Sequence, residues 1–154
     1  MTPVRLDMPT GPVTFHRLVL DFTGTLSLDG ALLPGVGARL ERLAGSLQIT
    51  VLTADTFGTA REALTGLPMD VRVIRNGEEK AQGVAAMDPE KVIAVGNGRN
   101  DIPMMEVAGL SIAVMGPEGA AAGLLASVDI VTREINDALD LILYPLRLKA
   151  TIRD

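Results

Sequence analysis

An aspartate that follows a buried apolar run, and is itself followed by a glycine turn, constrains this chain more than any other feature. Residues 18–20 read Leu-Val-Leu and predict the end of a buried strand. Asp21-Phe22-Thr23-Gly24-Thr25 comes next, and Gly24 allows a sharp turn that a side chain would prevent. In open α/β sheets, ligands gather at the carboxyl ends of the strands. Asp21 is therefore placed for chemistry, while an aspartate that only caps a turn is the alternative.

Strand and helix patterns alternate along the rest of the chain. The expected strands cover residues 4–8, 13–20, 47–52, 71–74, 92–95, 110–114 and 128–131. The expected helices cover residues 36–44, 61–64, 78–87, 102–108, 134–143 and 146–151, the last two separated by Pro145. Such alternation predicts a three-layer α/β fold with a central parallel sheet and right-handed crossovers.

Two short hairpins are expected in addition. Pro9-Thr10-Gly11-Pro12 separates the first two strands and predicts an N-terminal β-hairpin, whose second strand, 13–20, runs into Asp21. His16 lies within that strand and is expected to be a surface or satisfied side chain rather than a catalytic one. Asp29-Gly30 between short apolar runs predicts a β-hairpin flap over residues 26–33, near Asp21.

Three polar clusters each follow an expected strand. They are Asp21 to Thr25, Thr53-Ala54-Asp55-Thr56 and Gly96-Asn97-Gly98-Arg99-Asn100-Asp101. Because the strands are expected to run parallel, the three clusters should meet along one edge of the sheet. For each cluster taken alone, a turn or a helix cap is the structural alternative.

Length and composition limit the class of protein. The 154 residues suit one domain, 1–154, and the net charge of −5 argues against nonspecific nucleic-acid binding, which needs a basic face. No apolar run approaches the roughly 18 residues of a membrane span, and the N-terminus lacks the apolar core of a signal peptide. The chain has no cysteine, which excludes disulfides and thiolate metal sites. We expect a cytoplasmic protein without a membrane partner.

The first cluster resembles a known motif. Asp21-Phe22-Thr23-Gly24-Thr25-Leu26 is similar to the first motif of the haloacid dehalogenase superfamily, whose aspartate becomes phosphorylated. Threonine two residues later is closer to the phosphorylation motif of P-type ATPases, because most soluble phosphatases of the superfamily carry an acid/base aspartate there. The resemblance implies a Rossmann-like fold with Asp21 as nucleophile and Thr23 in the catalytic site.

Two further motifs would bind the phosphoryl group. Thr53-Ala54-Asp55 resembles the second motif of the superfamily, which implies that Thr53 and Ala54 contact phosphoryl oxygens. Lys80, near an expected helix start, resembles the lysine that neutralises the nucleophile and the phosphoryl group. Lys is unfavourable at the positive end of a helix, so its place there fits an anionic partner. Lys91 and a solvated surface role for Lys80 are the alternatives.

The third polar cluster resembles the fourth motif of the superfamily, which usually reads Gly-Asp-Gly-x-Asn-Asp. The resemblance implies a Mg²⁺ site formed by Asp21, the Thr23 carbonyl, Asn97 and Asp101, with Asn100 near the substrate. Asn97 replaces the usual aspartate and removes one negative charge. Weaker metal binding than is typical follows from that replacement.

The spacing of the motifs leaves no room for a cap domain, so the resemblance points to the capless, soluble P-type-ATPase-like phosphatases. We expect a Mg²⁺-dependent phosphatase that forms an aspartyl phosphate on Asp21 and acts on a small phosphorylated substrate. The open site and the high apolar content, 47%, suggest a homo-oligomer. The alternative is a regulatory or partner module that keeps the phosphate pocket but turns over slowly. A fragment of a membrane pump is disfavoured, because the chain begins and ends as a complete domain.

Thr23 limits the chemistry that can be expected. A threonine can neither protonate a leaving group nor activate water as an aspartate does, and such help is typically worth about 10²–10⁴-fold in rate. The phosphorylated enzyme should therefore accumulate unless another residue acts as acid or base. His16, Asp29 and Asp55 are the candidates.

Overall fold

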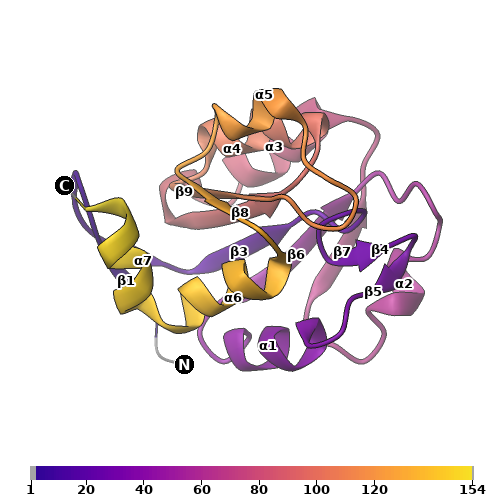
Figure 1. Ribbon diagram of the computed structural model, residues 1–154, viewed down its shortest axis with the longest axis horizontal. Helices are drawn as coiled ribbons and strands as arrows, with labels where there is room; N and C mark the ends of the chain where they lie inside the picture. The colour runs from indigo at the N-terminus through magenta and orange to yellow at the C-terminus, as the bar shows by residue number, and fades with distance from the viewer. Residues whose placement is uncertain (1–2, 154) are drawn as a thin grey trace.

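A six-stranded, fully parallel sheet forms the centre of the chain (Figure 1). The computed structural model describes residues 3–153, so three residues of the expected domain 1–154 (1, 2 and 154) lie outside the described residues. In spatial order the strands are β10 (Ile130–Thr132), β9 (Leu110–Val114), β8 (Val92–Gly96), β3 (Arg17–Leu20), β6 (Gln48–Thr53) and β7 (Asp70–Val73).

Helices cover both faces of the sheet, which confirms the expected three layers. The helices α3 (Gly77–Ala85), α4 (Ile102–Val107) and α5 (Ala122–Leu125) lie on one face, and α1 (Val36–Leu43) and α6 (Ile135–Leu143) lie on the other (Figure 1). The short helix α2 (Ala60–Ala63) follows β6, and the 3₁₀ turns η1 (Pro89–Lys91) and η2 (Arg99–Asp101) flank β8.

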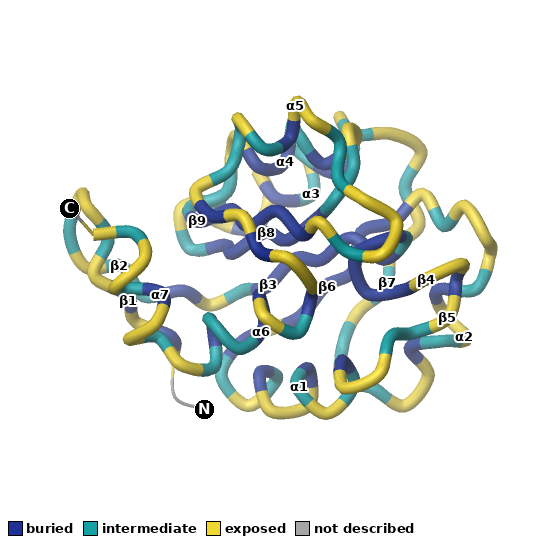
Figure 2. Tube along the Cα trace, viewed as in Figure 1, coloured by how far each residue is buried: buried dark blue, intermediate teal, exposed yellow. Residues whose placement is uncertain are grey.

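The inner strands β3, β6, β8 and β9 are buried on both faces, as near-continuous apolar runs in parallel sheets require, whereas the edge strand β7 is mostly exposed. Leu18 and Leu20 of β3 pack in the cluster that contains α1 and α6, whereas Val19 packs in the cluster that contains α3, α4 and α5. Figure 2 shows this burial as dark blue along the inner strands of the sheet. This alternation comes from the two-residue period of a strand, which points successive side chains to opposite faces of the sheet.

The expected strand 13–20 is in fact two strands, which corrects that prediction. β2 (Gly11–Phe15) pairs with β1 (Val4–Met8) in a separate antiparallel hairpin, and β3 begins at Arg17. At His16 the backbone changes partners: its N–H donates to the Lys91 carbonyl (3.0 Å) and its carbonyl accepts from the Gln48 N–H (2.9 Å). His16 is exposed, so the expectation of a surface histidine is confirmed.

The C-terminal helices α6 and α7 (Pro145–Ile152) are separated at Tyr144, where the proline predicted a break. α7 lies against the N-terminal hairpin, and Lys149 forms an ion pair with Asp7 across that contact (2.9 Å). This contact joins the C-terminal helix to the N-terminal hairpin on the side of the molecule opposite the strands β4 and β5 of the flap (Figure 1).

The expected flap is present as a two-stranded hairpin, β4 (Ser27–Leu28) and β5 (Ala31–Leu32), turning at Asp29-Gly30. Both turn residues have positive φ (51° and 82°), which asparagine, aspartate and glycine tolerate best. The turn is tied on two sides: the Asp29 N–H donates to Glu118 (3.1 Å), and the Gly30 carbonyl accepts from the Thr59 hydroxyl (2.7 Å). The flap therefore lies between two loops of the main domain.

No cap domain is present among residues 3–153, because only the flap and α1 lie between β3 and β6, and only α2 and β7 lie between β6 and α3. None of the helices in this described range is long and apolar enough to cross a membrane.

Gly77 is the first residue of α3, and a substitution there tests how closely that helix must approach the loop after β8. A Cβ at Gly77 would lie 2.5 Å from the Asn100 carbonyl oxygen. We expect Gly77→Ala to destabilise the protein by roughly 1–3 kcal/mol, because the backbone must shift to relieve the overlap. Urea unfolding measures this change.

Gly37→Ala in α1 is the matched control. Its Cβ would meet only Leu67 at 3.8 Å, an ordinary contact. Alanine in a helix should here stabilise by roughly 0.5–1 kcal/mol. Equal effects of the two substitutions would contradict the close approach of α3.

Candidate active site

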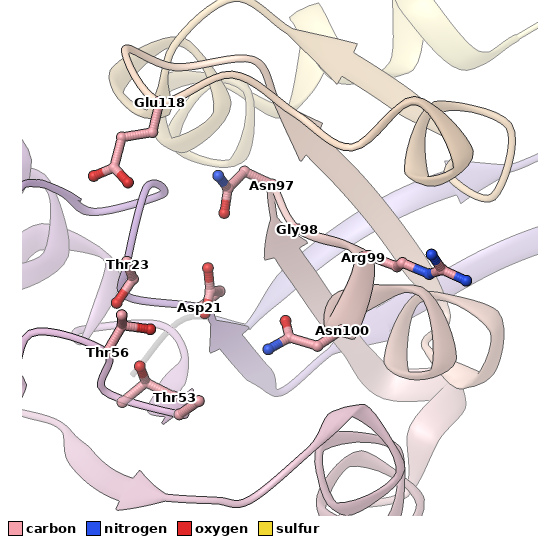
Figure 3. A pocket seen from close by; sticks show the side chains of 10 residues that line it. Asp21, Thr23, Thr53, Thr56, Asn97, Gly98, Arg99, Asn100 and Glu118 are labelled. Atoms are coloured by element: carbon pink, nitrogen blue, oxygen red, sulfur yellow. The ribbon is translucent and has the colours of Figure 1, made fainter.

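The loops that follow four neighbouring strands meet at one edge of the sheet. The chain runs from β3 to β6 and β7 on one side, then returns to β8 beside β3, so β3 lies at the topological switch point where α/β folds bind ligands. A cavity of about 370 Å³ opens there, lined by Asp21, Thr23, Thr53, Ala54, Thr56, Asn97, Gly98, Arg99, Asn100 and Glu118 (Figure 3). The expected meeting of the three polar clusters is confirmed.

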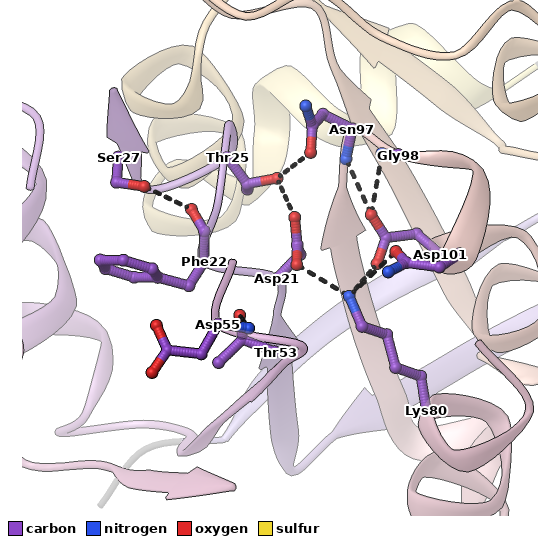
Figure 4. A network of polar contacts seen from close by, with 11 residues as sticks. Asp21, Phe22, Thr25, Ser27, Thr53, Asp55, Lys80, Asn97, Gly98 and Asp101 are labelled. Atoms are coloured by element: carbon purple, nitrogen blue, oxygen red, sulfur yellow. Dashed lines mark hydrogen bonds and ion pairs between the residues drawn. The ribbon is translucent and has the colours of Figure 1, made fainter. Parts of the chain in front are cut away.

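A buried lysine joins two carboxylates beneath this cavity. The Lys80 ammonium donates to Asp21 Oδ1 and to Asp101 Oδ1, both at 2.7 Å, and to Asn100 Oδ1 at 3.3 Å (Figure 4). Lys80 and Asp101 are fully buried, and Asp21 is 5% exposed. Three segments far apart in sequence thus share one ammonium group.

Asp101 supports the loop that carries Asn97. Its Oδ2 accepts the backbone N–H groups of Asn97 (3.1 Å) and Gly98 (2.9 Å), while its Oδ1 accepts from Lys80. Gly96 is required at this point, because a Cβ there would lie 2.4 Å from Asp101 Oδ2. Asp101 therefore sits behind the cavity wall with both oxygens engaged.

Thr25 links the nucleophile candidate to Asn97. Its hydroxyl lies 3.1 Å from Asp21 Oδ2 and 3.1 Å from Asn97 Oδ1 (Figure 4). The Asn97 amide nitrogen donates to the Gly119 carbonyl (3.0 Å), so the amide oxygen is turned toward Asp21. Asp21 Oδ1 is held by lysine and Oδ2 by threonine, which fixes the carboxylate plane.

The site carries more negative than positive buried charge. Burial, followed by the Asp101 charge, raises the pKa of Asp21 to about 7, although Lys80 and Thr25 act in the opposite direction. Burial would lower the pKa of Lys80, but the charges of Asp21 and Asp101 outweigh it and raise that pKa. One ammonium between two carboxylates leaves an excess of negative charge, which favours either a proton on Asp21 or a further cation.

Some residues of the second polar cluster line the cavity, and Asp55 caps the helix that follows. Thr53 is buried at the end of β6, and its hydroxyl oxygen accepts the Asp55 N–H at 2.9 Å. Asp55 Oδ1 accepts the N–H groups of Thr59 (3.0 Å) and Ala60 (3.1 Å) at the start of α2. The capping alternative therefore holds for Asp55, whereas Thr53 and Ala54 line the cavity.

Most of the predicted site residues come together, with two differences. Asp21, Thr23, Thr53, Ala54, Asn97 and Asn100 line the cavity, whereas Lys80 and Asp101 lie beneath it. The alternative lysine, Lys91, pairs with Asp88 at 3.4 Å next to the start of β8, at the opposite end of that strand from Asn97. The Thr23 hydroxyl is buried and finds no hydrogen-bond partner among the described residues.

Four residues that line the cavity were not predicted as site residues, namely Thr56, Gly98, Arg99 and Glu118, and Glu118 is the one that lies outside the three polar clusters. Glu118 belongs to Gly116-Pro117-Glu118-Gly119, a turn-forming segment that follows β9. The position of this segment after another parallel strand, β9, was the available signal, because β9 neighbours β8 in the sheet.

The chain belongs to the haloacid dehalogenase-like hydrolases, whose family model matches residues 53–139. The match contains Thr53, Lys80 and Asn97 but not Asp21. A stretch of 65 residues is 54% identical to an uncharacterized protein of Methanocaldococcus jannaschii and covers 42% of this chain and 70% of that protein. The expected enzyme class, a hydrolase of this superfamily, is confirmed.

Solved structures share the fold over nearly the whole chain. The cobalt-bound deoxy-D-mannose-octulosonate 8-phosphate phosphatase of Haemophilus influenzae has a TM-score of 0.72 at 17% identity, covering 91% of this chain and 94% of its own. The 3-deoxy-D-manno-octulosonate 8-phosphate phosphatase of Moraxella catarrhalis, in complex with magnesium, phosphate and a KDO molecule, has 0.72 at 17% identity, covering 88% and 90%. The Yersinia pestis enzyme of the same name has 0.66 at 20%, covering 97% and 96%. At these identities the likeness establishes the fold.

The donor atoms at the cavity fit Mg²⁺ bound jointly with a phosphate. Asp21 supplies a carboxylate and Asn97 an amide oxygen, and the buried negative charge around Lys80 is not fully balanced. No group of three or more histidine, aspartate or glutamate side chains within residues 3–153 could hold a metal ion. Mg²⁺ commonly uses one or two carboxylates together with substrate phosphate oxygens and water, and this donor set fits that pattern.

The raised pKa of Asp21 predicts how stability depends on pH. The pKa of Asp21 is about 7 in the folded state, whereas the ordinary aspartate value, 3.8, applies in the unfolded state. Between these two pH values the unfolded state has lost a proton that the folded state keeps. Wild-type stability from this carboxyl should therefore fall as the pH rises from about 4 to about 7. Asp21→Asn cannot ionise, and its melting temperature relative to wild type should rise over that range in EDTA.

Asp137→Asn, at an exposed position of α6, is the control and should show no such trend. A constant difference between Asp21→Asn and wild type from pH 4 to pH 8 would contradict the account of the buried charge.

Proposed function

We propose that this protein hydrolyses phosphate esters or acyl phosphates through a covalent aspartyl phosphate on Asp21. The observation that carries this proposal is the Asp21 carboxylate at the switch point of the sheet, oriented by Lys80 and Thr25 and open to a polar cavity. Family membership and the phosphatases of similar fold support the same reaction class.

Orientation and charge explain how Asp21 would attack. A carboxylate oxygen forms a bond to phosphorus while the bond from phosphorus to the leaving group breaks in line with it. Lys80 and Thr25 hold the carboxylate, which removes the need to order it during the reaction. The Lys80 charge also lies close to the negative charge shared by the nucleophile and the phosphoryl oxygens.

Thr53, Ala54 and Asn100 line the side of the cavity where a phosphoryl group would lie. The Thr53 hydroxyl accepts from Asp55 N–H, which leaves its own hydrogen free to donate to a phosphoryl oxygen. Asn100 is exposed above Lys80 and could donate through its amide. These groups recognise the phosphoryl part of the substrate, and a small phosphorylated compound fits the cavity.

Asp21, the Thr23 carbonyl and Asn97 would hold Mg²⁺, which when bound would neutralise negative charge on the phosphoryl group. Asp101 was expected as a fourth ligand, but unlike Asp21 it is fully buried and does not line the cavity, and Lys80 and the loop backbone engage its oxygens. We therefore assign Asp101 to positioning Lys80 and Asn97. The magnesium in the Moraxella catarrhalis phosphatase supports the choice of ion.

Thr23 supports the resemblance to the phosphorylation domain of P-type ATPases. It also favours the second candidate, a regulatory or partner module with slow turnover, because no carboxylate occupies this position. The expected homo-oligomer stays a prediction.

The test is phosphate release from acetyl phosphate, p-nitrophenyl phosphate and glycerol 3-phosphate, with Mg²⁺ or with EDTA. Acyl and aryl phosphates should react faster than the alkyl phosphate, because their leaving groups need no protonation and Thr23 cannot supply a proton. Mg²⁺ should be required, and Asp21→Asn should lose more than about 10³-fold of the rate, since it removes the nucleophile.

Asp137→Asn should retain full activity and controls for protein quality. A substantial rate with Asp21→Asn would rule out the covalent route. Stable phosphate binding with negligible turnover of all three compounds would favour the second candidate function, the regulatory or partner module.

A further inference from the structure

The second step of the proposed reaction needs a base to activate water, and the three candidates named from the sequence are badly placed. His16 precedes β3, at the opposite end of that strand from Asp21. Asp55 Oδ1 accepts two backbone N–H groups at α2. Asp29 lies in the flap turn and is not among the residues that line the cavity.

Glu118 is a carboxylate that does line the cavity, and Asp21 is the other one among the lining residues. Figure 3 shows its side chain extending from the loop after β9 toward Thr23, across the cavity from Thr53. The residue is exposed, so water reaches it. It thus lies on the same side of the cavity as Thr23.

The loop that carries Glu118 is held in place from several directions. The next residue, Gly119, accepts the Asn97 amide N–H (3.0 Å), and the Ala121 N–H donates to the Asn97 carbonyl (2.9 Å). Glu118 Oε2 itself accepts the Asp29 N–H of the flap at 3.1 Å. These contacts connect the segment around Glu118 to the loop after β8, which carries Asn97, and to the flap. Glu118 is therefore held by neighbouring loops although it is exposed.

We propose that Glu118 is the general base for hydrolysis of the aspartyl phosphate, an inference that rests on the proposed function. A water molecule attacks phosphorus, and its proton passes to the Glu118 carboxylate, directly or through a second water. The bond between phosphorus and the Asp21 oxygen breaks and returns the electron pair to the Asp21 carboxylate. Inorganic phosphate leaves, and Glu118 releases the proton to solvent through the open cavity.

The flap contact does not prevent this role. An ionised carboxylate has about four acceptor sites, so Glu118 can accept the Asp29 N–H and still take a proton from water. The contact instead fixes the carboxylate at the mouth of the cavity. Glutamine can keep the same acceptor, which makes Glu118→Gln a substitution that removes the base and preserves the tether.

The test is rapid acid quench after mixing enzyme with acetyl [³²P]phosphate and Mg²⁺, for wild type, Glu118→Gln and the control Glu134→Gln. Glu134 is an exposed carboxylate that borders a different cavity. Glu118→Gln should gain label at the wild-type rate but lose it at least about 10²-fold more slowly, the usual scale of general-base help. Glu134→Gln should behave as wild type.

Glu118→Ala allows a chemical rescue experiment, whose result would not change if Glu118 had only a structural role. Formate can enter the space left by the side chain, and it should restore dephosphorylation in Glu118→Ala but not in Glu118→Gln. Labelled enzyme that loses phosphate at the same rate in wild type and Glu118→Gln would overturn the role of Glu118 alone. Absence of both label and turnover in all variants would overturn the proposed function and this inference together.

Discussion

The ammonium of Lys80 between Asp21 and Asp101 is the interaction on which the rest of the site depends. It joins the end of β3, the first turns of α3 and the loop after β8 in a region where water does not reach it. Removing one partner from such a buried group typically costs about 3–5 kcal/mol, because the remaining charges lose their compensation. The same arrangement leaves one carboxylate, Asp21, facing the cavity. The same three charged side chains, Lys80, Asp21 and Asp101, therefore connect the elements of the site and provide its reactive carboxylate.

The parallel sheet explains why this cluster can form. Parallel strands carry their carboxyl ends to one edge, and the return of the chain from β7 to β8 places β8 beside β3. Asn97 and Asp101 then lie next to Asp21, although about 80 residues separate them in sequence. Close approaches at Gly77 and Gly96 let α3 and the loop after β8 pack without side chains in the way.

The sequence predicted the sheet, the flap and most of the cavity wall, because buried strands and glycine-rich loops are local signals. It placed Asp21, Thr53 and Asn97 correctly at strand ends. It did not predict the change of pairing partner at His16. Residues 13–20 have the pattern of one continuous strand, and no glycine or proline marks the point where the backbone leaves the hairpin and enters the sheet. It also named Asp101 as a Mg²⁺ ligand, but it could not predict that Lys80 and backbone N–H groups engage both oxygens of that carboxylate beneath the cavity. Glu118 was missed as a site residue because its place in the cavity depends on the neighbouring order of β8 and β9.

The central claim is that Asp21 becomes phosphorylated. It is tested most directly by peptide mass spectrometry of the wild-type protein after brief reaction with acetyl phosphate and Mg²⁺ and an acid quench that preserves acyl phosphates. The account predicts one phosphate, on the peptide that contains Asp21 and assigned by fragmentation to that carboxylate. A phosphate on another residue, or turnover without any phosphorylated peptide at the earliest times, would contradict it.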